Sequence, residues 1–135
     1  MKSKVTWCDT TLVKTPIHYG LCLRESDFHA ELRRMGVPRD HWPPFIRTAH
    51  ADATAHHFES TSEYRDATIV CVDMERAKKR DPLEVVGLLV HEAMHIWQRI
   101  REHIGETNPS SEFEAYSVQW IVQELCGAYR DALDR

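Results

Sequence analysis

Alternating and β-branched apolar positions dominate the first half of the chain and predict a small sheet. Residues 16–23 alternate in a way that suits a strand, and residues 46–58 place alanines between polar side chains at every second position. Residues 67–72 form a β-branched run that is apolar on both faces. A strand that is apolar on both faces is usually covered on both sides, so we expect residues 67–72 to be central in the sheet.

A short helix is predicted between the first two strands. Ser26 is a candidate N-cap, and Phe28, Leu32 and Met35 recur on one side of the helix until Gly36. Glycine is the usual residue where a helix ends in the left-handed conformation. The proline-rich residues 38–44 follow, and since proline removes backbone donors and restricts its neighbours, no helix should cross them.

Helical spacing dominates the second half of the chain. Asp81 as a cap, Pro82 at the first helical position and Glu84 in a capping-box arrangement signal the start of a long helix that runs to Gly105. A last helix is expected over residues 111–133. The apolar residues at helical spacing in the long helix are Leu83, Val86, Leu89, Val90, Ala93, Ile96, Trp97, Ile100 and Ile104.

Length and composition predict one domain over residues 1–135, because this length suits one core and is short for two. The net charge of -4 and the lack of a long basic block argue against a nucleic-acid surface. The opening residues show neither a secretory signal nor a membrane span, so we expect a cytoplasmic protein. The four cysteines are widely spaced, without a Cys-x-x-Cys pair, and should be reduced.

The long helix carries the pattern His91-Glu92-Ala-Met-His95. Residues i and i+4 project from the same side of a helix, so two imidazoles can share one metal ion, and Glu92 is placed to act as general base on an activated water. Zinc is the ion expected with this pattern. The alternative is a purely structural pair of partly buried histidines that are hydrogen-bonded to polar neighbours.

A catalytic zinc site commonly has three protein ligands, so a third ligand is expected downstream. Gln98 and Arg101 occupy the positions where a longer histidine motif would place its glycine and third histidine. Two glutamates follow at the start of the last helix. Glu114 can form a capping box with Ser111, which leaves Glu112 the freer carboxylate, although capping by Asn108 would keep both glutamates open as ligands.

The chain from His91 to His95, followed by Glu112-x-x-Ala115-Tyr116, resembles the gluzincin class of zinc metallopeptidases. Residues 81–130 also resemble small metallopeptidase-like proteins of bacteriophages and prophages. The resemblance implies an α+β, minimal zincin-like fold, with a small twisted sheet packed against the metal helix and a C-terminal helix, and it favours Glu112 as third zinc ligand. Tyr116 stands where the class usually has Asp or Asn.

The expected activity is hydrolysis of a peptide bond in a peptide or protein substrate, by water that zinc activates and Glu92 deprotonates. A second donor to the oxyanion could come from Tyr64, His103 or Tyr116, which the sequence does not rank. The alternatives are a non-catalytic, zinc-stabilised protein-interaction module of phage type, and a module without metal.

A second local group of histidines, His50, His56 and His57, lies on the predicted strand over residues 46–58. His50 and His56 would share one face of the strand and His57 the other, so at most two could converge. Exposed strand positions commonly carry histidine, and this structural interpretation is favoured. If the strand borders the cleft, one of the three could contact substrate or metal.

Overall fold

The computed structural model describes residues 4–8, 17–48, 51–59 and 66–134 and has a mixed α+β architecture. The first half contains the sheet and the second half two long helices, as the periodicity predicts. The elements in chain order are β1 (Thr6–Trp7), β2 (His18–Cys22), α1 (Glu25–Met35), a 3-10 turn (Arg39–His41), β3 (Ala53–Phe58), β4 (Ala67–Val72), α2 (Met74–Ala77), α3 (Pro82–His103) and α4 (Ser111–Leu133).

Within the described residues the four strands form one mixed sheet in the order β1-β2-β4-β3. β2 and β4 are parallel, with Cys22 opposite Cys71, while β1 and β3 run antiparallel to their neighbours. β4 is therefore internal and buried along its whole length, as its apolar run predicts. β3 forms an edge of this sheet, and Ala55 lies opposite Val70.

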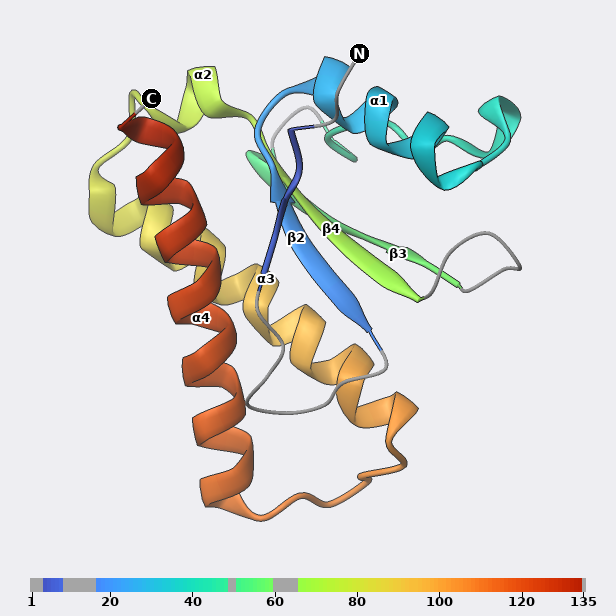
Figure 1. Ribbon diagram of the computed structural model, residues 1–135. Helices are drawn as coiled ribbons and strands as arrows, with labels where there is room; N and C mark the ends of the chain where they lie inside the picture. The colour runs from blue at the N-terminus through green and yellow to red at the C-terminus, as the bar shows by residue number, and fades with distance from the viewer. Residues whose placement is uncertain (1–3, 9–16, 49–50, 60–65, 135) are drawn as a thin grey trace.

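Helices α3 and α4 lie on one face of the sheet and α1 on the other (Figure 1), and a hydrophobic layer fills each interface. One layer joins the sheet to α3 and α4, and Trp97, Leu89 and Leu125 are buried in it. The other joins the sheet to α1 through Phe28 and Leu32. The α-helices thus cover both faces of the sheet. Because α3 packs against one face, the helix that carries the histidines lies beside the strands.

The bounds of the two long helices follow their capping residues. The Asp81 carboxylate accepts a hydrogen bond from the Leu83 amide at 2.8 Å, and Pro82 is the first helical residue. Glu84 does not complete a box here, because its carboxylate pairs with Arg80 at 3.2 Å. α4 is capped by Ser110 rather than by Ser111 or Asn108, since the Ser110 hydroxyl accepts from the Phe113 amide.

Several other expectations at the level of elements were wrong in detail. The N-cap of α1 is Arg24, two residues before the predicted cap Ser26, and the helix begins at Glu25. Its C-cap is Gly36 with φ of 78°, as predicted. The proline-rich stretch contains a single 3-10 turn. β3 begins at Ala53, well after residue 46, because the chain before it bends and the Arg47 amide donates to the Thr54 hydroxyl.

Four apolar residues of the predicted stripe on α3 are exposed instead of buried: Leu83, Val86, Val90 and Ile104. Leu83 has 79% of its surface accessible. The stripe that is buried is narrower, and includes Val85, Leu89, Ala93 and Ile96.

The four cysteines are free thiols, as predicted. Cys22 and Cys71 are buried on neighbouring strands, where each fills the core as a small apolar residue. In the part of the chain that the structure describes, no helix has the length and apolar character needed to cross a membrane.

Candidate metal centre

His91 and His95 lie one turn apart on the exposed side of α3, and their rings approach closely. The two Nε2 atoms are 3.1 Å apart, and the ring centroids are 4.8 Å apart with the rings nearly perpendicular. Two nitrogen lone pairs repel at this distance, so a proton must be shared between the Nε2 atoms. A metal ion at the same point would replace that proton and accept both lone pairs.

The second ring nitrogen of His95 has a partner that fixes the proton. His95 Nδ1 lies 3.3 Å from Gln98 Oε1, a carbonyl oxygen that can only accept. The proton therefore lies on Nδ1, and Nε2 is left with its lone pair facing His91. An oxygen that holds the outer N–H of a ligating histidine is the usual arrangement around a protein-bound metal.

Glu92 points from the same turn of α3 toward the sheet and is buried, with 4% of its surface accessible. The Ala55 backbone N–H donates a hydrogen bond to its carboxylate. The second oxygen, Oε2, is buried without a hydrogen-bond partner among the described residues. Burial raises the pKa of Glu92, and the charges of His91 and His95 partly oppose this rise.

The edge strand β3 runs along this part of α3 and brings two further side chains to it. Glu59 Oε1 lies 3.8 Å from Arg99 Nη2, one turn beyond His95. His57 lies in the sequence between Ala55, which contacts Glu92, and Glu59, and its Nδ1 is 2.7 Å from Thr68 Oγ1. Burial lowers the pKa of His57, and the neighbouring Arg99 and His95 act in the same direction.

A structural role was favoured for His57, because periodicity assigns a residue to a face of a strand without indicating which face meets α3. His56 lies on the opposite face, where its Nε2 is 3.0 Å from the Phe45 carbonyl and its ring stacks on Phe28. His50 lies outside the described residues. The predicted divergence of His56 and His57 is therefore confirmed, and the signal that could have identified His57 was its shared face with Ala55.

The two downstream glutamates are placed differently from each other. Glu114 accepts a hydrogen bond from Trp97 Nε1 at 2.8 Å and lies 3.6 Å from Arg101, so its structural role is a contact with α3 rather than a capping box. Glu112 is exposed in the first turn of α4. Among the described residues no group of three or more His, Cys, Asp or Glu is placed to hold a metal ion, so the structure does not gather Glu112 with His91 and His95.

The three candidates for an oxyanion donor remain unranked. Tyr64 lies outside the described residues. His103 Nε2 contacts the Asp66 carboxylate, and Tyr116 has 61% of its surface accessible on α4.

A hollow of about 490 Å³ opens along α3 just beyond His95. Its lining is charged, with carboxylates and cations from both the helix and the strand side: Glu59, Asp66, Arg99, Glu102 and His103. Arg99 and Glu102 follow His95 at helical spacing, so the hollow lies on the side of α3 that carries the histidines.

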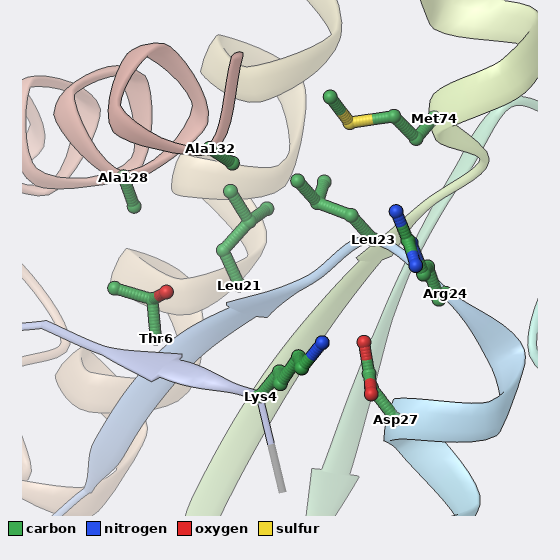
Figure 2. A pocket seen from close by; sticks show the side chains of 9 residues that line it. All are labelled: Lys4, Thr6, Leu21, Leu23, Arg24, Asp27, Met74, Ala128 and Ala132. Carbon is green, nitrogen blue, oxygen red and sulfur yellow. The ribbon is translucent and has the colours of Figure 1, made fainter. Parts of the chain in front are cut away.

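A second cavity, of about 250 Å³, lies near the N-terminal end of α1 and shares no residue with the histidine pair. Figure 2 shows Lys4 and Asp27 extending toward each other across it, with Arg24 nearby. Leu21, Leu23, Met74, Ala128 and Ala132 contribute the apolar part of its lining. Its donor groups are those of an ordinary charged surface and include no imidazole or thiol.

No protein-family model, curated protein or solved structure matches the chain.

Proposed function

We propose that the protein is a zinc-dependent peptidase in which His91 and His95 bind the ion and Glu92 is the general base. The observation that carries the proposal is the arrangement on one turn of α3. Two imidazole nitrogens converge at 3.1 Å, and beside them a buried carboxylate has one oxygen without a hydrogen-bond partner in the part of the chain that the structure describes.

The donor set suits zinc. Neutral imidazole nitrogen is a preferred ligand of this ion, and Gln98 holds His95 in the tautomer that offers Nε2. When bound, a zinc ion supplies a Lewis acid that polarises a carbonyl group and makes water much more acidic. The exposure of both histidines leaves room for a substrate, and the hollow beyond His95 extends that room.

Glu92 has the features of a base that handles a proton. The Ala55 N–H fixes one side of the carboxylate, so the other oxygen is held in a defined place, ready to accept a proton from water. Its pKa is raised toward neutral pH, and a general base is most effective when its pKa lies near the working pH. The same oxygen can then return the proton to the leaving amine.

The α+β arrangement, with a metal helix packed against a small mixed sheet and supported by α4, is compatible with a minimal zincin-like fold of gluzincin type. A peptide or protein substrate is proposed because acid–base chemistry at an activated water is suited to amide hydrolysis. The assignment of Glu112 as third ligand remains a prediction.

The test combines metal analysis with a cleavage assay on the whole chain. We expect about one zinc per wild-type chain by elemental mass spectrometry and cleavage of fluorescently quenched casein. Glu92→Gln should keep the zinc and lose activity by about 100-fold or more. His91→Ala and His95→Ala should lose the zinc, while His41→Ala, which removes an exposed histidine from the 3-10 turn, should retain both zinc and cleavage.

Two results would contradict the proposal in different ways. Wild-type protein without zinc, even after incubation with zinc chloride, would refute the metal centre. Zinc that depends on His91 and His95, together with no cleavage of casein or of a random peptide library, would leave a zinc-stabilised interaction module instead of a peptidase.

A further inference from the structure

We propose that His57 of β3 is the third protein ligand of the metal centre, in place of the downstream glutamate. This inference rests on the proposed function, because it needs an ion at His91 and His95. It concerns a strand residue that precedes the metal helix in the sequence by more than thirty positions.

The first support is the register between β3 and α3. The Ala55 N–H contacts Glu92, and Glu59 contacts Arg99 at 3.8 Å. Both segments advance in the same direction between these contacts. His57 is midway between Ala55 and Glu59, and His95 lies between Glu92 and Arg99, so the two histidines occupy corresponding positions.

Strand geometry directs the His57 side chain to the correct face. Side chains two residues apart point to the same side of a strand, and Ala55 is packed in the core layer that contains α3. On α3, Glu92, His95 and Arg99 lie within one stripe of the helix surface, because steps of three and four residues return to nearly the same side. The His57 side chain therefore points from β3 toward α3, and His95 lies on the side of α3 that is nearest to β3.

The ring nitrogens of His57 are arranged as in His95. Nδ1 lies 2.7 Å from the Thr68 hydroxyl, on the neighbouring strand β4. With its proton on Nδ1, the ring donates to Thr68 and keeps the Nε2 lone pair for a metal ion, the arrangement expected when an outer partner orients a ligand.

α4 lies on another side of α3, which disfavours Glu112. The start of α4 contacts α3 through Trp97, whose Nε1 donates to Glu114 and whose ring meets Phe113 with centroids 5.5 Å apart. Trp97 follows His95 by two residues, which is a rotation of about 200° around the helix. A ligand from Glu112 would have to reach around the helix, whereas His57 shares its strand face with Ala55, which packs in the same core layer as α3. As the side chains stand, no group of three or more His, Cys, Asp or Glu among the described residues is placed to hold a metal ion, so the His57 ring would have to move toward His91 and His95.

The test measures zinc affinity directly, by competition between metal-free protein and a chromophoric chelator. We expect His57→Ala to weaken zinc binding by about 100-fold or more, since loss of an outer-shell partner alone costs up to about that factor. Glu112→Ala and the exposed-histidine control His41→Ala should stay within about twofold of wild type. The opposite pattern, with Glu112→Ala weakened and His57→Ala unchanged, overturns the inference and supports the glutamate.

A second experiment distinguishes the loss of a metal ligand from altered folding, because it measures a new absorption band instead of a loss of zinc affinity. Cobalt(II) is added to His57→Cys and to Glu112→Cys under reducing conditions. A thiolate ligand produces an intense charge-transfer absorption with cobalt, which we expect in His57→Cys and not in Glu112→Cys or wild type. Absence of the band in His57→Cys, in protein with native circular dichroism, overturns the inference.

The outcomes separate this inference from the proposed function. If zinc binding needs His91 and His95 but is indifferent to His57, only the third ligand is wrong. If wild-type protein binds no zinc, both proposals fail.

Discussion

Replacing Glu92 by Gln should stabilise the metal-free protein. The wild-type carboxylate is buried and has one oxygen without a hydrogen-bond partner among the described residues. A buried polar group left unsatisfied costs about 1–3 kcal/mol, and more when it is charged. The glutamine side chain has the same shape and keeps an oxygen for the Ala55 N–H. Its NH2 group takes the unpaired position, so the hydrogen-bond cost stays, but the buried charge is removed, and we expect a gain of about 1 kcal/mol in the free energy of unfolding, or about 4 °C in Tm.

The difference in stability between Glu92→Gln and wild type should depend on pH in a defined direction. Burial raises the pKa of Glu92 above its ordinary value of 4.5, so stability is lost as the pH rises through the folded-state pKa and the carboxyl group ionises. Below pH 4.5 the side chain is neutral in both the folded and unfolded states, and Glu92→Gln should then match wild type. The advantage of the variant should therefore grow from pH 4.5 toward pH 8.

Urea unfolding of chelator-treated protein, followed by circular dichroism at several pH values, measures both effects. Asp40→Asn, which removes an exposed carboxylate in the 3-10 turn, is the matched control and should differ from wild type by less than about 0.5 kcal/mol. A destabilised Glu92→Gln, or a gain that does not change with pH, would refute the reasoning that the buried charge is costly.

Three further predictions concern the scaffold and the ion. Gly20→Ala should lower stability by about 1–3 kcal/mol in urea unfolding, because a Cβ there would lie 2.8 Å from the Thr6 carbonyl oxygen; an unchanged midpoint would contradict this. Trp97→Phe should cost about 1–3 kcal/mol through the lost bond to Glu114 and the smaller ring, whereas Glu114→Gln, which keeps an acceptor, should cost less. Chelation with EDTA should lower the Tm of zinc-loaded wild type but not of His91→Ala, which thermal denaturation would reveal; equal shifts would argue against the histidine site.

Local signals predicted the elements that have strong boundaries. The Asp81-Pro82 start set the first turn of α3, and a β-branched run apolar on both faces defined β4. β1 was missed because two residues are too few for a period to emerge. The early part of residues 46–58 was assigned to a strand because alternating alanines fit a strand pattern even where the chain bends.

The candidate site was predicted as far as one helix can specify it. Spacing alone places His91 and His95 on one side of α3, and the structure confirms that their rings meet. What spacing could not supply is the direction from which a second element approaches. The contact of Ala55 with Glu92 and the packing of Trp97 on α4 are tertiary facts, and no spacing rule along the chain predicts them.

The alignment of β3 with α3 has a consequence for folding. An ion shared by His57, His91 and His95 would tie the β3–β4 hairpin to the helical hairpin and close a loop with 33 residues between the nearest two ligands. Closing a flexible chain of that length costs about 3 kcal/mol of entropy. Metal bound in the native state would offset that cost, so the ion would fasten the two halves of the chain together, and its uptake would report that the halves have docked.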